Sequence, residues 1–169
     1  EKLEKATNNT VKQADLLQQA NNAMMLGIVK TDDEMAQLFD TAQRLGQALG
    51  KDTVRSIESL VTGMGRQSRL MLANLGIIVK SEEAYERYAT ELSKSVSLLT
   101  DSEKKTAFNN EAMRQARLIV DSLGKEQETT SMKVQRMSKA TSDLSIEIGK
   151  ALVPVLEVMV IALEKIAKN

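Results

Sequence analysis

The chain has 169 residues, of which 23 are basic and 23 acidic, so its formal net charge is zero. This balance argues against a dedicated nucleic-acid binder, which would usually carry a basic excess. Cysteine and histidine are both absent, which removes disulfides and the commonest zinc, haem and nucleophile–base arrangements.

The composition favours a helical protein. There are two Phe, two Tyr, no Trp and one proline, so a core must be built from aliphatic side chains and methionine, and long helices are permitted almost everywhere. The chain opens with Glu1 and ends inside a helical pattern at Asn169, and we expect it to be a piece of a larger protein. The predicted fold class is all-α, with several short-to-medium amphipathic helices followed by a long C-terminal helix.

Residues 1–30 are predicted to form one N-terminal helix. Leu3, Val11, Leu17 and Ile28 fall near one side at helical spacing. Asparagines interrupt the apolar stripe on this side, and a stripe this weak predicts a helix that leans on a partner.

Residues 31–123 are predicted to form a helical module. Thr31 and Glu34 have the spacing of a capping box, in which each side chain satisfies a free amide of the other residue. The helix that they open is expected to stop at Gly50, and Asp52 is expected to cap the next one. That next helix should end at 63–65, Gly-Met-Gly, which we interpret as a hinge.

The module contains one stretch with strand propensity, 77–79 (Ile-Ile-Val), within the sequence LGIIVK. Because no second strand is predicted for it to pair with, we expect an extended connector with buried side chains. A shorter copy of this motif, at 26–33, parallels 75–82. Helix is expected to resume at Ser81, and Thr100 with Glu103 forms a second capping-box pattern.

Residues 124–169 are predicted to form a long helix with an eleven-residue apolar repeat. The stripe comprises Met137, Ala140, Leu144, Ile148, Ala151, Val155, Met159, Ala162 and Ile166. An eleven-residue period predicts a straight or slightly right-handed bundle. The stripe could pack against the chain's own module or mediate self-association. Pro154 should bend the helix near Lys150.

The end of this helix is apolar enough to raise the question of a membrane span. Lys150, Glu157, Glu164 and Lys165 interrupt it, and the longest apolar run near the end is 158–163. A span needs roughly twenty apolar residues. The segment is therefore not a span as written, although it would form the edge of one if an apolar sequence continued it.

No catalytic, cofactor-binding or metal-binding residue is predicted, and the chain is not expected to be an enzyme. The sequence 46–52, GQALGKD, imitates a phosphate loop but has the wrong glycine spacing, and Asp follows its lysine. The acidic clusters 32–34 and 82–83 stand where helices are expected to begin, and acidic residues are favourable there. Arg66, Arg69 and Lys80 form a small basic spot without interleaved aromatic residues, typical of a solvated face.

Residues 58–124 resemble a segment of the tail tape-measure proteins of long-tailed phages and prophages. The resemblance is carried by LGIIVK at 75–80, EAYERYA at 83–89 and LTDSEKKTAFNNEAMRQA at 99–116. It implies a structural protein that lies in the tail lumen of the virion, sets tube length and is ejected ahead of the DNA. It also implies synthesis in the bacterial host cytoplasm, contacts with tail tube, tail tip and tail assembly chaperone proteins, and host-membrane contact by flanking segments.

Two other classes of function remain open from the residues alone. A membrane-active helical module, pore-forming or toxin-like, would use 148–166. A helical adaptor bundle would instead be a compact monomer with a defined groove.

Overall fold

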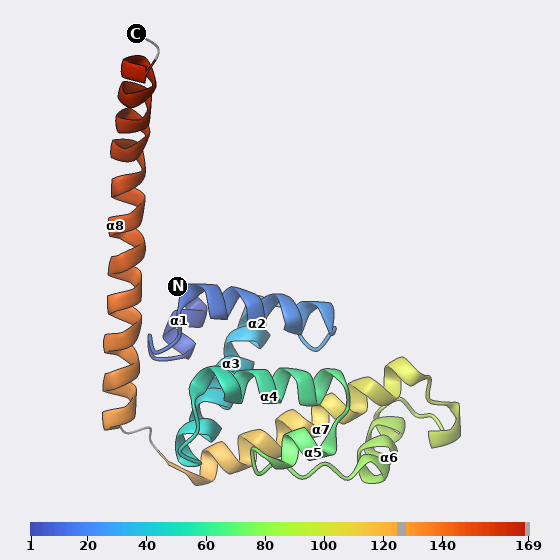
Figure 1. The fold of residues 1–169 in the computed structure, drawn as a ribbon. Helices are drawn as coiled ribbons and strands as arrows, with labels where there is room; N and C mark the ends of the chain where they lie inside the picture. Colours follow the sequence, from blue (N-terminus) through green and yellow to red (C-terminus); the bar gives the residue numbers. More distant parts are fainter. Residues whose placement is uncertain (125–127, 168–169) are drawn as a thin grey trace.

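The computed structural model describes residues 1–124 and 128–167, with side chains described as far as Ile161. The described backbone is helical and contains no strand, which confirms the all-α prediction with its long C-terminal helix. Figure 1 shows the first seven α-helices gathered into a module, with α8 passing one side of it and continuing well beyond. The helices are α1 (Lys2–Ala6), α2 (Gln13–Met25), α3 (Asp32–Ala48), α4 (Thr53–Gly65), α5 (Arg69–Ala73), α6 (Ser81–Glu91), the 3-10 helix η1 (Val96–Leu98), α7 (Asp101–Ser122) and α8 (Thr130–Ala167).

The N-terminal segment forms two helices, so the prediction of a single helix over residues 1–30 was wrong. The break falls at Asn8 and Asn9, whose φ angles are 51° and 56°. Asparagine tolerates this left-handed conformation better than most residues do. The hydroxyl of Thr10 supports the turn by donating to the carbonyl of Thr7 at 2.6 Å. The asparagines that weakened the apolar stripe therefore end the first helix.

The first two helices belong to the module. Val11, Leu16 and Ala23 are buried in the same core cluster as side chains of α3, α4 and α7. The surface that this N-terminal segment leans on is thus supplied by its own chain.

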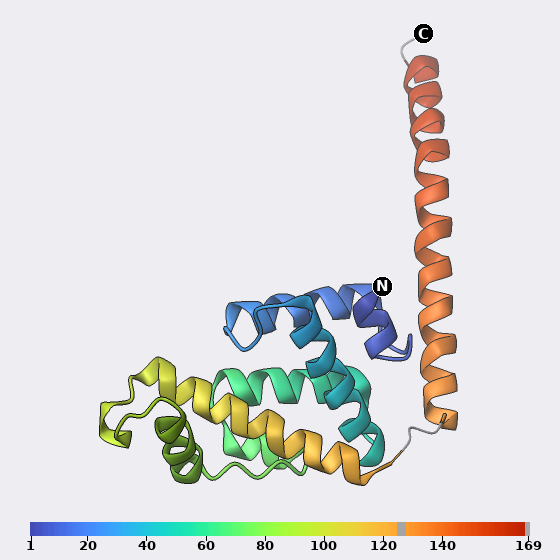
Figure 2. The same cartoon turned by 180° about the vertical axis from the view of Figure 1, so that it is seen from behind.

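The core lies where α3 packs against α4 and α7. Both phenylalanines are fully buried there, and the remaining volume is filled by aliphatic side chains and methionine, as the composition predicts. The largest fully buried apolar side chains are Phe39, Phe108, Leu38, Leu45, Ile57, Leu60, Met64, Leu72, Leu75, Ile77 and Val11. Figure 2, which views the molecule from behind, shows α7 lying across this module.

Glycines mark the closest approaches between elements. A Cβ atom added to Gly46 of α3 would lie 2.1 Å from the Oγ atom of Ser56 on α4. A Cβ added to Gly63 or Gly65 would lie 2.8 Å from Leu72 or 2.5 Å from Leu26, respectively. The Gly63–Gly65 stretch, interpreted from sequence as a hinge, is thus part of α4 and packs tightly against its neighbours.

The two copies of the LGIIVK-type motif end their helices in the same way. Gly27 follows α2 and Gly76 follows α5, with φ angles of 64° and 76°. In each copy the amide after the glycine donates to the carbonyl five residues earlier, at 3.2 Å in the first copy and 3.1 Å in the second. This hydrogen bond belongs to the Schellman motif, which favours glycine at the left-handed position. The motif therefore ends one helix and sets the path toward the next.

The connector after Gly76 is partly as predicted. Ile77 and Val79 are buried, whereas Ile78 is 69% exposed. Such alternation is expected of an extended backbone, in which successive side chains point to opposite sides. The prediction of a connector without a partner strand holds, but one of its three side chains faces away from the core.

The Gly46 contact generates a stability prediction. Replacing Gly46 with Ala would push a methyl group into the Ser56 side chain, so α3 and α4 must separate or Ser56 must move. We expect the free energy of unfolding, measured by urea denaturation, to fall by about 1–3 kcal/mol.

Gly149→Ala is the matched control, because a Cβ added at Gly149 of α8 meets nothing within 4 Å. This control should be neutral, or up to about 1 kcal/mol more stable because alanine favours helix. Equal stability of the two variants would contradict the close-packing account of Gly46.

Candidate interaction surface

The first turns of α8 are attached to the module by a small set of contacts. Met132 is 5% exposed. The Nε atom of Arg136 donates to the backbone carbonyl of Asn8 at 2.7 Å, and the Nζ atom of Lys139 lies 3.7 Å from a carboxylate oxygen of Glu4. The apolar pattern predicted contacts from Met137 onward and did not predict this anchor, which begins earlier in the helix, at Met132, and is mostly polar.

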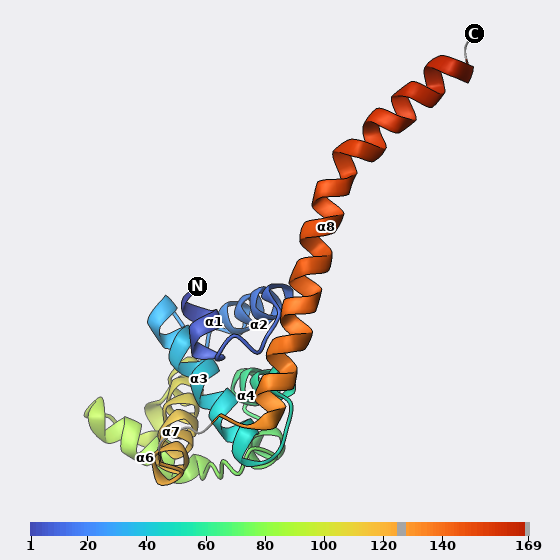
Figure 3. The same ribbon diagram turned by 90° about the vertical axis from the view of Figure 1, so that its left-hand side faces the viewer.

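Beyond this anchor, α8 leaves the module. Every residue from Leu144 to Ile161 is exposed, and Figure 3 shows this part of the helix extending past α1 and α2. The residues of the apolar stripe are exposed as well: Met137, Leu144 and Ile148 are 71%, 60% and 52% exposed. The described part of the stripe thus does not pack on the chain's own module, and the side chains of Ala162 and Ile166 lie outside the described residues.

The exposed segment is apolar around most of its circumference, well beyond the predicted stripe. Charged residues in it are confined to Glu147, Lys150 and Glu157, whose spacings of three and seven place them on one side of a helix. Outside the stripe, the apolar side chains that are more than half exposed are Ile146, Leu152, Val153, Leu156, Val158, Val160 and Ile161. A helix that is apolar nearly all round is normally buried among neighbours or in lipid.

Pro154 lies inside α8, which continues through it. Proline removes one backbone donor and crowds the carbonyl four residues earlier, that of Lys150. Figure 3 shows α8 bent part-way along its exposed half, in agreement with the predicted bend.

The described residues contain neither a candidate membrane span nor a candidate metal-binding cluster. Within this part of the chain, no helix combines the length and the apolar character needed to cross a bilayer. No group of three or more acidic, histidine or cysteine side chains in the same residues is arranged to hold a metal ion.

The acidic clusters singled out in the sequence lie at helix N-termini, and the first of them includes a capping residue. The Oγ1 atom of Thr31 accepts from the amide of Glu34 at 3.2 Å, and the Glu34 carboxylate accepts from the amides of Thr31 and Lys30 at 3.2 and 2.6 Å. At the start of α6, Glu83 pairs with Lys80 at 2.8 Å. Both clusters thus have a structural role at helix N-termini.

The sequence that imitates a phosphate loop is a helix–helix turn. Gly50 has a φ angle of 65° after the end of α3, and the Asp52 carboxylate caps α4 by accepting from the amide of Arg55 at 3.0 Å. The Nζ atom of Lys51 donates to the carbonyl of Asn74. The basic spot is likewise a surface feature, because its three side chains are exposed.

A buried ion-pair cluster joins α6 to α7. Glu111 is 6% exposed and contacts the guanidinium groups of Arg87 at 2.9 Å and Arg114 at 2.7 Å. The hydrogen bonds from Arg114 lower the pKa of Glu111 from its ordinary value, against an opposing effect of burial. The cluster therefore holds α6 against α7 through an ionised carboxylate.

Neither a protein-family model nor a solved structure matches this chain. The functional evidence is thus carried by its own residues, above all by the uncovered part of α8.

The capping box of α7 generates a pH prediction. The Glu103 carboxylate accepts from Lys94 at 2.6 Å and from the amide and hydroxyl of Thr100 at 2.8 and 2.9 Å. These bonds, the one from Lys94 first, lower the pKa of Glu103 from 4.5 to about 2. Since the folded-state pKa is the lower one, this stabilisation is present above pH 4.5 and is lost as pH falls toward about 2.

We expect Glu103→Gln, which keeps the capping geometry, to lose less stability than wild type over that interval in thermal melts. Glu82→Gln, which removes an exposed carboxylate in the first turn of α6, is the matched control and should follow the wild-type curve. An unchanged pH profile in Glu103→Gln would refute the assignment.

Proposed function

We propose that this chain is a structural, non-enzymatic segment of a phage tail tape-measure protein. In this role it lies in the tail lumen of the virion, sets the length of the tail tube and leaves ahead of the DNA on infection. The observation that carries the proposal is the exposed apolar part of α8, from Leu144 to Ile161. A long helix that its own module leaves uncovered is suited to run beside other helices in a confined space.

The geometry of α8 supports a role as a ruler. The helix is continuous over 38 residues, which corresponds to roughly 57 Å at 1.5 Å per residue. Helical residues convert sequence length into physical length at a fixed rate. A protein that measures a tube needs this property.

The exposure of the repeat supports self-association. Leu144, Ile148, Val155 and Met159 are each more than half exposed. Burying such a side chain fully contributes about 1.5–3 kcal/mol, so a few of them on neighbouring copies suffice to hold helices together. Because the helix is apolar well beyond the stripe, each copy has surface for more than one neighbour.

The module supports the proposal through the resemblance of residues 58–124. This stretch runs from α4 to α7 and supplies Leu60, Leu72 and Phe108 to the core. In the proposed protein the module is a folded unit attached to the ruler helix, and tail tube, tail tip and assembly chaperone proteins are its expected partners. No specific nucleic-acid contact is proposed.

A membrane-active module is the second candidate. It is favoured by the same apolar circumference of α8, with charges only on one side. The two candidates differ in what covers the apolar surface of α8. In the tape-measure protein it is covered by other copies of the helix, and in the membrane-active module it is covered by lipid.

Self-association is tested by a pair of charge substitutions. Val155→Glu places a charge in the middle of the apolar stripe. Ile161→Glu is the matched control, because helical spacing places Ile161 on the face that already carries Lys150 and Glu157. We expect light scattering and small-angle X-ray scattering to show an elongated oligomer for wild type and Ile161→Glu, and a monomer for Val155→Glu.

Flotation with phosphatidylglycerol vesicles separates the alternatives. A wild-type monomer that floats with the vesicles would favour the membrane-active module. A monomer that does not float would contradict both uses of α8.

The ruler function is tested in the phage or prophage that encodes the chain. Four additional copies of residues 148–158, inserted after Val158, would add 44 residues without changing the repeat. We expect electron micrographs to show tails longer by roughly 66 Å. The control replaces 148–158 with a scrambled sequence of equal length and composition. Because the number of residues is the same, this variant should leave tail length unchanged. Tails of unaltered length after the insertion would overturn the proposal.

A further inference from the structure

The apolar stripe of α8 faces away from the module even where the helix and the module lie side by side. The residues of α8 that face the module are at least partly buried: Met132, Gln135, Arg136, Lys139, Ser142 and Asp143. On the other side of the same turns, Val134 and Met137 are 60% and 71% exposed. The stripe is therefore open from Met137 to Met159, a length of roughly 33 Å at 1.5 Å per residue.

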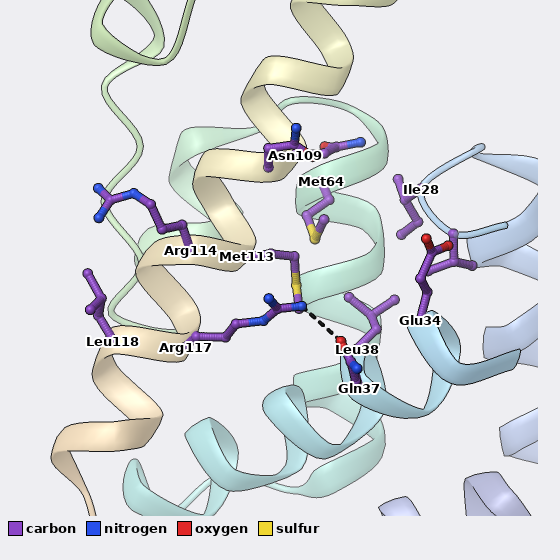
Figure 4. Close-up of a pocket in the computed structure, with 12 residues that line it drawn as sticks. Ile28, Glu34, Gln37, Leu38, Met64, Asn109, Met113, Arg114, Arg117 and Leu118 are labelled. Atoms are coloured by element: carbon purple, nitrogen blue, oxygen red, sulfur yellow. Dashed lines mark hydrogen bonds between the residues drawn. The ribbon is translucent and has the colours of Figure 1, made fainter. Parts of the chain in front are cut away.

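The groove between α3 and α7 is a poor partner for this stripe. Its volume is about 420 Å³, enough for a few side chains but not for the length of the stripe. Figure 4 shows Asn109 and Arg117 of α7 on one side of the groove and Gln37 of α3 opposite. Glu34 and Arg114 also line it, and charged groups lose hydration against an apolar helix. The stripe needs an elongated apolar surface instead, and α8 of a second copy provides one.

The order of the residues in the stripe makes it complementary to itself. From Ala140 to Met159 the steps are four, four, three, four and four, so the pattern is the same in both directions about the midpoint between Ile148 and Ala151. In an antiparallel pair centred on this midpoint, each alanine faces a large side chain of the partner. The facing pairs are Ile148 with Ala151, Leu144 with Val155, and Ala140 with Met159.

A parallel pair in register would pack less evenly. Each residue of the stripe would face its own counterpart, so Ala140 and Ala151 would form small layers between the large layers of Leu144, Ile148 and Val155. The large layers would set the distance between the helices and leave cavities at the alanines, and cavities reduce stability. Large residues that face small ones fill every layer to a similar extent.

The charges beside the stripe do not oppose the antiparallel direction. Glu147 flanks the stripe by helical spacing, so the two copies of this residue lie on the same edge of an antiparallel pair. Its carboxylate is paired with Lys150 of its own helix at 3.2 Å, and both side chains are well exposed. Repulsion between such solvated and partnered charges is small, so the packing of the apolar layers decides the direction.

We propose that α8 pairs with α8 of a second copy in the antiparallel direction, about a two-fold axis between Ile148 and Ala151. The inference rests on the self-association proposed above and adds its direction and register. Identical surfaces meet in such a pair, as they do in the common two-fold dimers. Each helix lies on the open side of the other, away from the partner's module, and the two modules lie at opposite ends of the pair.

The direction is tested by disulfide trapping, because the chain has no cysteine of its own. Leu144→Cys and Val155→Cys chains are mixed in a glutathione redox buffer, and the linked peptides are identified by mass spectrometry. In the antiparallel pair, residue 144 faces residue 155 of the partner, whereas the two copies of residue 144 are roughly 16 Å apart along the helices. Since a disulfide requires Cα atoms within about 7 Å, we expect 144–155 links to exceed 144–144 and 155–155 links at least about tenfold.

Ser138→Cys is the matched control. Ser138 is exposed on α8 but lies off the stripe by helical spacing, so its cysteine should form few links with either variant. Dominant 144–144 and 155–155 links would show a parallel arrangement and overturn the inference, while self-association would stand. An oligomer in light scattering without any of these links would also overturn it, because the contact would lie elsewhere. A monomer would overturn both the inference and the self-association on which it rests.

An exchange of residue sizes tests the register without cysteines. Ala140→Met would crowd Met159 of the partner, and Met159→Ala would leave a gap against Ala140, so each variant should raise the dimer Kd at least about threefold in analytical ultracentrifugation. The combined variant again has one large and one small residue in each of these layers, and its Kd should return to within about twofold of wild type. Losses that add in the combined variant would contradict the facing of residues 140 and 159.

Discussion

The close approach of α3 and α4 is the constraint on which the module depends. With so few aromatic side chains, the core cannot be filled by large rings, so the helix backbones must come near one another to exclude water. Gly46 and Ser56 make that approach possible, because no larger pair fits where an added methyl group would lie 2.1 Å from the serine oxygen. The same solution recurs at Gly63 and Gly65, and α7 then closes the core with Phe108.

The sequence predicted local features that are decided within a few residues. The capping boxes at Thr31 and Thr100 formed with the expected reciprocal hydrogen bonds, and the glycine before the Ile-Ile-Val connector ended its helix. These features depend on hydrogen bonds between residues three to five positions apart and on the tolerance of glycine for a left-handed backbone, so they can be predicted without knowledge of the fold. The apolar pattern from Met137 onward likewise predicted a long helix within 124–169, because period alone decides that, although the helix begins only at Thr130.

Features set by tertiary contacts could not be predicted in this way. From the sequence, Asn8 and Asn9 were interpreted as polar interruptions of one continuous helix. Their left-handed turn could not be predicted, because it is stabilised only when Val11 packs into the core. The Gly63–Gly65 stretch looked like a break because glycine is flexible by itself, and only the positions of Leu26 and Leu72 show why glycine is needed. Asn109 was unremarkable in the sequence, because its burial depends on α3 and α4 lying opposite α7.

The anchor of α8 also determines how the molecule responds to force. Tension applied along the exposed end of α8 reaches the module through a few contacts. The polar ones join Arg136 to the backbone of Asn8, Lys139 to Glu4 and Gln135 to Thr53, and the buried Met132 adds a contact with Gln47. This small set is weaker than the extensive apolar packing between α3, α4 and α7. Such a load would detach α8 first and leave the module folded, so the strength of this anchor sets the force at which the long helix separates from the module.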